Sequence, residues 1–423
     1  MSPTERGALV LYQVVWLAAL PLAFGYLLWR SRRQPAYRRH WAERLGRYRN
    51  ARPASAPIWL HLVSVGETRG AQPLVRALEQ AHPGVPLLIT HMTPTGRDTS
   101  AALYPHATRV YLPYDHPWLV RGFLRTFRPR LALIMETELW PTLIHESADA
   151  GVPVAIVNAR LSERSLRKGL RFERLIAPAL RRLTRLLAQG EADATRLARL
   201  GRGADAVTGN LKFDVHPDRD LEARGRQWRG ALGPTPVVML ASSRDGEEAA
   251  LMQAWTARPA AHREGVRLCI VPRHPQRFDE VAAVMGACGP LRRRSQQWDG
   301  SDPAMLLGDS MGEMGAYYAL ADVVIMGGSL MPFGGQNLIE ACAAGVPVIL
   351  GPHTHNFAQV SEQAIEAGAA LRVADADGAL ALALDLLDDR DRLEAMRESA
   401  REFAAAHRGA SERTLAALRP LLQ

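Results

Sequence analysis

Short apolar runs alternate with longer helical stretches along the chain from about Ile58 onward. This alternation is typical of parallel β-sheets that carry helices on both faces. The pattern therefore predicts an α/β protein with two doubly wound, Rossmann-like sheets. The expected strands are residues 58–63, 87–90, 110–112, 131–135, 154–157 and a weak one near Leu186, then 237–240, 268–271, 304–307, 323–326 and 346–350.

A polar stretch rich in proline and glycine, residues 213–236, separates the two groups of strands and is predicted to be a linker. We accordingly expect one Rossmann-like domain over residues 31–212 and a second over residues 237–423, facing each other across a cleft. Ligands of such sheets bind beyond the carboxyl ends of the strands. The residues directly after each strand are therefore the first candidates for function.

The N-terminal segment is uniformly apolar. Residues 7–29 contain no charged side chain, and at about 1.5 Å per residue they can cross a hydrocarbon core of about 30 Å. A cleaved signal peptide would have a shorter apolar region with more positive charge before it than Arg6 alone, so we favour a membrane anchor over residues 1–30. Whether this helix spans the membrane or lies on it stays open.

The net charge of +9 is concentrated directly after the anchor. Between Arg30 and Arg52 there are nine arginines and a single acidic residue, Glu43, whereas the remaining chain is close to neutral. This distribution favours a surface that faces anionic lipid headgroups and argues against a nucleic-acid-binding domain. By the positive-inside rule, both domains are expected in the cytoplasm.

The three cysteines, Cys269, Cys288 and Cys342, lie far apart. They have neither the spacing of metal ligands nor the even number expected of a disulfide framework. We therefore expect a reducing compartment and no structural metal.

A glycine-rich stretch, residues 326–341 (MGGSLMPFGGQNLIEA), follows a predicted strand and leads into a helix expected from about Asn337 to Ala344. Glycines allow the main chain to approach a phosphate closely, and exposed amides at a helix start favour an anion. Glycines that serve only turn geometry are the alternative. Asn337 and Glu340 share one helix face and could contact a ribose. Residues 351–357 (GPHTHNF) follow the next strand and are expected to close the same pocket.

Two further segments follow strands of the second domain. In residues 271–275 (VPRHP), Arg273 could bind a phosphate or a base, although any single arginine is more often a surface residue. In residues 308–314 (GDSMGEM), the amides of Met311, Gly312 and Glu313 could bind an anion, unless Asp309 or Ser310 simply caps the helix.

Carboxylates follow two strands of the first domain. Glu67 lies after the first strand, where it could accept a proton as a general base or merely stabilise the helix start. Glu136 and Glu138 lie after the fourth strand, where they could bind a hydroxylated or cationic group. The alternative is a helix cap by Thr137 and Glu138.

Of the 52 basic residues only two are lysines, Lys168 and Lys212. Since a compact ammonium is not interchangeable with a planar guanidinium, a lysine retained against this bias indicates a specific role. We assign that role to Lys212, in GNLKFD, and regard Lys168 as part of a basic surface.

Taken together, the anchor and the motifs SVGE, METELWP, NARLSERS, GNLKFD, VPRHPQRF, GDSMGEM, GGQNLIEA and GPHTHNF resemble the 3-deoxy-D-manno-octulosonic acid (Kdo) transferases of lipopolysaccharide synthesis. The resemblance covers nearly the whole chain. It implies a GT-B fold and a metal-independent, inverting transfer of Kdo from CMP-Kdo to the lipid A precursor lipid IVA at the cytoplasmic face of the bacterial inner membrane.

The resemblance also implies roles for single residues. The first domain would bind the acceptor, with Glu67 as general base and with Glu136 and Lys212 stabilising the transition state. The second domain would bind CMP through Pro272, Arg273, Met311, Gly312, Glu313, Asn337, Leu338, Ile339 and Glu340.

One departure from the family pattern is visible in ASSRDGEE, where Ser243 and Arg244 replace the usual threonine and histidine. Arginine can still donate to a phosphate or carboxylate. Two other functions stay open on the sequence: a GT-B enzyme that uses a UDP-sugar, and a membrane-tethered nucleotide sensor without catalysis.

Overall fold

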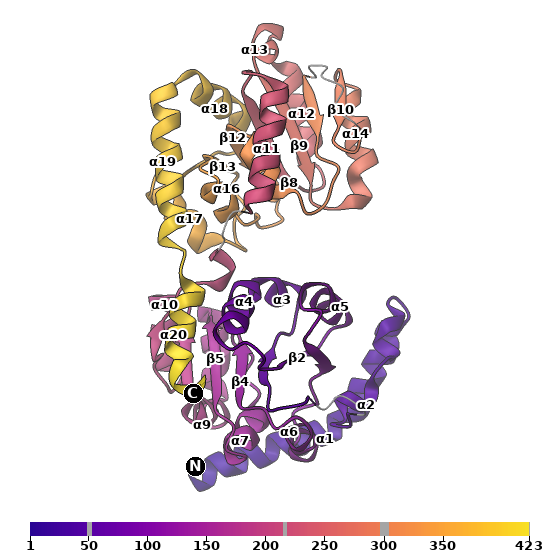
Figure 1. The fold of residues 1–423 in the computed structure, drawn as a ribbon, viewed down its shortest axis with the longest axis vertical. Coiled ribbons are helices and arrows are strands. Elements are labelled where there is room, and N and C mark those ends of the chain that lie inside the picture. Colours follow the sequence, from indigo (N-terminus) through magenta and orange to yellow (C-terminus); the bar gives the residue numbers. More distant parts are fainter. Residues whose placement is uncertain (49–52, 215–217, 297–303, 423) are drawn as a thin grey trace. The chain divides into compact units, whose positions relative to one another are not determined.

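In a computed structural model, the chain divides into two compact units, each built on one parallel β-sheet (Figure 1). The structure describes residues 1–48, 53–214, 218–296 and 304–422. Unit 1 comprises Met1–Asp214 and Gly409–Gln423, and unit 2 comprises Val215–Arg408. Arg49 and Arg52 of the basic segment lie outside the described residues.

The sheet of unit 1 has the strand order β3-β2-β1-β4-β5-β6-β7 with parallel neighbours. Apolar side chains from both of its faces form two separate clusters, so the sheet is covered on both sides. Its strands are β1 (Ile58–His61), β2 (Leu87–His91), β3 (Thr108–Tyr111), β4 (Leu131–Met135), β5 (Val154–Ala159), β6 (Arg185–Ala188) and β7 (Ala206–Val207).

The helices of unit 1 follow the strands in alternation, as the sequence pattern predicts. They are α1 (Pro3–Ser31), α2 (Trp41–Arg44), α3 (Val65–Gly70), α4 (Gln72–Ala81), α5 (Pro94–Leu103), α6 (Pro117–Phe127), α7 (Pro141–Asp149), α8 (Glu163–Arg171), α9 (Glu173–Arg182), α10 (Glu191–Arg199) and α20 (Ala410–Leu422), with short 3-10 turns η1 (Pro35–Arg38) and η2 (Leu211–Phe213).

Unit 2 repeats this architecture with the strand order β10-β11-β9-β8-β12-β13-β14. Its strands are β8 (Val237–Ser243), β9 (Arg267–Pro272), β10 (Leu291–Arg293), β11 (Met305–Leu307), β12 (Val323–Met326), β13 (Val348–Leu350) and β14 (Ala370–Arg372). Its helices are α11 (Arg219–Leu232), α12 (Glu247–Ala257), α13 (Ala260–Glu264), α14 (Phe278–Gly286), α15 (Met314–Leu320), α16 (Ile339–Ala343), α17 (Ala358–Glu366), α18 (Ala376–Asp388) and α19 (Arg390–Ala406), with the turn η3 (Pro275–Arg277).

The two parallel sheets confirm the predicted fold class, and all eleven predicted strands are present. The sequence pattern missed β7, β10 and β14, which are only two or three residues long and lie at sheet edges. The helix expected at Asn337–Ala344 is also shorter, since it begins at Ile339.

The division of the chain differs from the predicted boundaries in two places. Most of the expected linker, residues 213–236, is the helix α11, which belongs to unit 2. Asp218 caps this helix, and Gly225 lies where an added Cβ would meet the carbonyl of Ala316 at 2.3 Å, so the glycine serves close helix packing. Conversely, α20 returns to unit 1, because Ala410, Leu418 and Leu422 are buried in its core.

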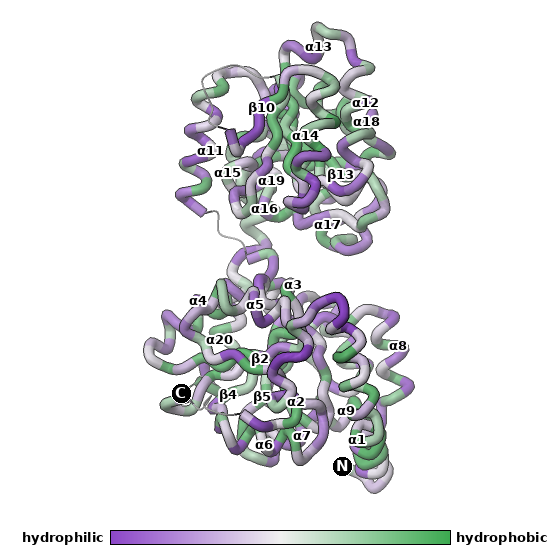
Figure 2. The backbone as a smooth tube through the Cα atoms, turned by 90° about the vertical axis from the view of Figure 1, so that its right-hand side faces the viewer, coloured by the Kyte–Doolittle hydropathy of each residue, from purple (hydrophilic) through white to green (hydrophobic). Residues whose placement is uncertain are grey.

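Helix α1 begins at Pro3 and contains the whole apolar segment, residues 7–29, of the predicted anchor. Among the described residues it is the one helix long and apolar enough to cross a membrane (Figure 2). It packs along unit 1: Trp16 stacks on Tyr114, and Phe24 contacts Tyr114 and Trp41. The Tyr12 hydroxyl donates to the buried Asp115 carboxylate at 2.8 Å. One side of α1 therefore packs against the rest of unit 1.

Candidate active site

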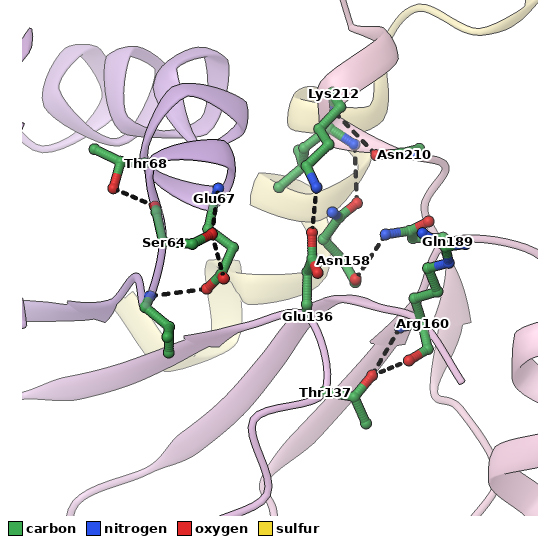
Figure 3. Close-up of polar contacts among 12 residues, drawn as sticks. Ser64, Glu67, Thr68, Glu136, Thr137, Asn158, Arg160, Gln189, Asn210 and Lys212 are labelled. Carbon is green, nitrogen blue, oxygen red and sulfur yellow. Dashed lines mark hydrogen bonds and ion pairs between the residues drawn. The ribbon is translucent and has the colours of Figure 1, made fainter. Parts of the chain in front are cut away.

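Glu67 lies in the first turn of α3, directly beyond β1. Its side chain is only 6% exposed and accepts hydrogen bonds from the Val63 amide at 2.9 Å and the Ser64 hydroxyl at 2.8 Å (Figure 3). Ser64 in turn caps the helix by accepting from the Glu67 amide. The carboxyl group is therefore held in one orientation at the end of the strand.

Burial raises the pKa of Glu67 to about 7, even though its two hydrogen bonds act in the opposite direction. The charges of Glu136 and Glu138 add to the increase. Glu67 also lies in the first turn of α3, so the stabilisation of the helix start that we predicted as an alternative stays open. A pKa close to neutrality is the property of an effective general base.

Glu136 follows β4, the neighbour of β1 in the sheet, which explains why it lies near Glu67. It accepts from the Lys212 ammonium at 2.5 Å, with side chains 26% and 34% exposed, respectively. The pair is thus accessible from one side. The retained lysine that we singled out in the sequence is brought to the same edge of the sheet as both carboxylates (Figure 3).

The backbone around this pair is unusual. Glu136 and Asn158 adopt positive φ values of 58° and 56°, which are uncommon for residues other than glycine. Asn158 is fully buried and its side-chain oxygen accepts from the Leu211 amide at 2.9 Å, while Asn210 accepts from the Lys212 amide at 3.0 Å. These two asparagines therefore fix the turn that carries Lys212. From the sequence we predicted no individual role for either asparagine.

The alternative of a helix cap by Thr137 and Glu138 is wrong. Helix α7 has Trp140 at its N-cap position and no side-chain cap. The Thr137 hydroxyl instead exchanges hydrogen bonds with the main chain of Arg160. The pKa of Glu138 is raised by burial and by the charge of Glu136.

The predicted donor-binding residues all lie in unit 2. Pro272 ends β9 and is buried, and Arg273 beyond it is exposed. The pKa of the buried Tyr318 phenol is raised by burial and by the charge of Glu340, and the charge of Arg273 opposes this. Arg273 and Glu340, far apart in the sequence, therefore lie around the same phenol.

In GGQNLIEA, Asn337 and Glu340 are half-exposed, whereas Leu338 and Ile339 are buried in the core. Leu338 and Ile339 can therefore offer a ligand only their main chain. The Asn337 side chain accepts from the Ile339 amide at 3.1 Å and so shapes the start of α16.

Our expectation that the amides of the glycine-rich loop are exposed is wrong for its first part. The amides of Gly328, Leu330 and Met331 donate to the buried Glu247 carboxylate at 2.7, 3.0 and 3.3 Å. These amides are thus bonded to an anionic side chain of the protein itself. We did not predict a role for Glu247, because these loop amides lie about eighty positions away in the sequence.

The same loop contacts residues 351–357 (GPHTHNF), which we predicted to close its pocket. The His353 amide donates to the Ser329 carbonyl, and the Asn356 amide donates to the Gly334 carbonyl. The Asn356 side chain also donates to the Phe333 carbonyl at 2.9 Å. Gly334 has φ 93°, and a Cβ there would meet the Asn356 side chain at 2.3 Å. This glycine is therefore required for the close approach of the two segments.

Met311 and Gly312 are exposed and directly precede Glu313 at the start of α15. Neither Asp309 nor Ser310 caps this helix. The Asp309 carboxylate accepts from Arg293 and Ser295 instead. The Ser310 hydroxyl donates to Glu313. Glu313 also accepts from Arg224 and Arg294, and these bonds outweigh the effect of burial and lower its pKa.

Comparisons with known proteins identify the family of the chain. A family model described as 3-deoxy-D-manno-octulosonic-acid transferase (kdotransferase) matches residues 39–215, and one described as glycosyl transferases group 1 matches residues 290–403. The 3-deoxy-D-manno-octulosonic acid transferase of Bordetella pertussis is 48% identical over 86% of this chain and 87% of its own. That of Haemophilus influenzae is 33% identical over 97% and 98%, respectively.

Among solved structures, the chain resembles the UDP-GlcNAc 2-epimerase from Neisseria meningitidis bound to UDP-GlcNAc, with a TM-score of 0.57. The match covers 86% of this chain and all of the epimerase at 14% identity. At that identity it shows the shared two-sheet architecture alone.

Proposed function

Because the chain belongs to the Kdo transferase family, and is therefore a glycosyltransferase that transfers Kdo in lipopolysaccharide synthesis, we propose that it uses CMP-Kdo as donor and a glucosamine hydroxyl of lipid IVA as acceptor. The observation that carries this proposal is the buried Glu67 carboxyl with its pKa near 7, beside the Glu136–Lys212 pair. Membership of a transferase family sets aside the non-catalytic sensor.

The proposed reaction is an in-line displacement. Glu67 takes the proton of the acceptor hydroxyl, and that oxygen forms a bond to the anomeric carbon of Kdo. On the opposite side of this carbon the bond to the phosphate oxygen breaks, and CMP leaves with the bonding electrons. Inversion at the anomeric carbon follows. We assign charge stabilisation in the transition state to Glu136 and Lys212.

We assign donor binding to unit 2. The residues are Pro272, Arg273, Met311, Gly312, Glu313 and Asn337 to Glu340, of which Arg273, Asn337 and Glu340 have accessible polar side chains. Arg273 suits the phosphate, because a guanidinium can donate two parallel hydrogen bonds to it. No role of a metal is required by this scheme.

The proposal predicts one product. Purified enzyme with CMP-Kdo and a tetra-acylated lipid A precursor should yield, by mass spectrometry, the acceptor enlarged by one or more Kdo residues. CMP should compete with the donor and UDP should not. An acceptor of unchanged mass would refute the proposed function, and competition by UDP but not CMP would support a UDP-sugar enzyme instead.

We also propose that α1 holds both units at the cytoplasmic face of the bacterial inner membrane. Tyr12, Trp16 and Phe24 pack on unit 1, whereas Leu11 and Leu22 on the other side of the helix are 65% and 76% exposed. Since the packed side must stay with unit 1, these contacts favour an anchor that lies along the membrane surface over one that crosses it.

This orientation can be tested by labelling. In a Cys288→Ser background, a Ser2→Cys variant should resist a membrane-impermeant maleimide in intact spheroplasts and react after lysis. The other two cysteines, Cys269 and Cys342, are buried. Wild-type Cys288, which is partly exposed in unit 2, reports the cytoplasmic side. Labelling of the Ser2→Cys variant in intact spheroplasts would show that α1 spans the membrane.

A further inference from the structure

In unit 2, two neighbouring strands end at residues that are paired with each other, and an arginine follows each of these two residues. Ser243, the last residue of β8, is the register partner of Pro272, the last residue of β9. Arg244 and Arg273 are the next residues, and the Arg273 amide donates to the Ser243 carbonyl at 3.0 Å. Because paired strands lie about 4.8 Å apart, the two side chains start from adjacent points.

Within the described part of the chain, neither guanidinium has a carboxylate within ion-pair distance. Arg277, only four residues after Arg273, shows the contrast, because it pairs with Glu248 at 2.7 Å, Glu280 at 3.0 Å and Asp245 at 3.4 Å. The charge of Arg277 is thus balanced within the protein, whereas those of Arg244 and Arg273 are available to a ligand.

Arg244 is also held in place. Its guanidinium lies over the Phe333 ring at 4.6 Å, and its amide donates to Glu247 at 2.8 Å. The preceding Ser243 hydroxyl donates to Glu248 at 2.6 Å. Stacking on an aromatic face leaves the in-plane N–H groups of a guanidinium free to donate. Arg244 is therefore a half-exposed cation that is oriented before any ligand arrives.

We propose that Arg244 binds the carboxylate of the donor sugar while Arg273 binds the adjacent phosphate. This inference rests on the proposed function. In CMP-Kdo the carboxylate and the phosphate oxygen are attached to the same anomeric carbon, so the donor presents two neighbouring anions. Two arginines that follow adjacent strand ends, neither with a carboxylate partner among the described residues, match them. A UDP-hexose has no carboxylate at this carbon, so Arg244 is a specificity-determining residue for the donor.

The same geometry gives Glu247 a positioning role. Its four hydrogen bonds tie the Arg244 turn to the loop that carries Phe333. β8 and β12, the strands that precede these two segments, are neighbours in the sheet. Glu247 therefore acts through Arg244 and Phe333 and does not itself contact the donor.

The test compares two ligands that differ by the Kdo group. Affinities for CMP-Kdo and CMP are measured by titration calorimetry on the full chain without acceptor. An Arg244→Gln variant should bind CMP-Kdo about 10- to 100-fold more weakly than wild type, because it loses a hydrogen bond to a charged group of the donor. Its affinity for CMP, which lacks that group, should stay within about twofold of the wild-type affinity. Arg244→Lys should recover part of the lost affinity.

Arg273→Gln is the matched control and should weaken both ligands, since both carry the phosphate. Thermal unfolding of each variant checks that it is folded. An unchanged ratio of the two affinities in Arg244→Gln would overturn the inference while leaving the proposed function intact. If the wild-type protein binds CMP but not CMP-Kdo, the proposed function itself fails.

Discussion

Glu67→Gln is expected to lower kcat for Kdo transfer by about 10²- to 10⁴-fold, which is the usual contribution of a general base. Glutamine preserves the shape of the side chain, but its amide cannot take the proton of the acceptor hydroxyl. The residues that we propose to bind the donor lie in unit 2, whereas Glu67 belongs to unit 1. The affinity for CMP-Kdo should therefore be unchanged. Steady-state kinetics and donor titration on the same preparation measure both quantities.

The pH dependence gives an independent check on Glu67. Burial raises its pKa to about 7, so the active carboxylate form is lost as the pH falls below 7. The value of kcat/KM should therefore increase up to about pH 7 and level off above it. In Glu67→Gln the residual rate should lose this inflection. A variant that retains wild-type turnover would contradict the assignment.

Stability provides a control for folding in the same variant. A carboxyl whose pKa is raised in the folded state favours folding when protonated, and this contribution is lost as the pH rises through about 7. Glu67→Gln removes the charge, so its free energy of unfolding should exceed that of wild type at pH 8, with a smaller difference at pH 5. Loss of activity with increased stability at pH 8 would exclude misfolding as the cause.

The architecture could be predicted because it depends on local patterns. Strands such as β4 and β12 are continuous apolar runs bounded by polar residues or glycine, and their limits match the predicted ones. The polar segment 213–236 was misassigned because proline and glycine suggest a linker, whereas α11 depends on packing against α15. The return of α20 to unit 1 is likewise a tertiary contact with no local signal.

The candidate site likewise contains residues that a local pattern reveals and residues that only tertiary contacts reveal. Glu67, Glu136 and Lys212 follow strands or stand out by composition, and the structure brings them to one edge of one sheet. Glu247 could not be found in this way. A glutamate in the first turn of a helix is common, and only the folded loop reveals that its carboxylate binds amides of the distant segment 328–331.

Lys212→Met is expected to lower kcat by about 10²- to 10³-fold, the range found when one preorganised charge-stabilising donor is removed. Methionine keeps much of the length of the side chain and removes its charge. Glu136, which now accepts from the ammonium at 2.5 Å, would lose its partner and stand near Glu67 as an unbalanced negative charge. The pH inflection assigned to Glu67 should consequently move upward. A variant with unchanged kcat and unchanged inflection would refute the role of Lys212.

The position of the ammonium can be tested without changing Lys212 itself. A Cβ added at Gly70 would meet the Lys212 Cγ at 2.7 Å, so Gly70→Ala must displace the lysine stem away from α3. Gly66 lies in the same helix, and a Cβ there would meet only the Ser64 Oγ at 3.8 Å, an ordinary contact. Gly70→Ala should therefore lower kcat by about tenfold or more, whereas Gly66→Ala should remain close to wild type. Equal effects of the two substitutions would indicate that general changes in α3, and not the placement of Lys212, control the rate.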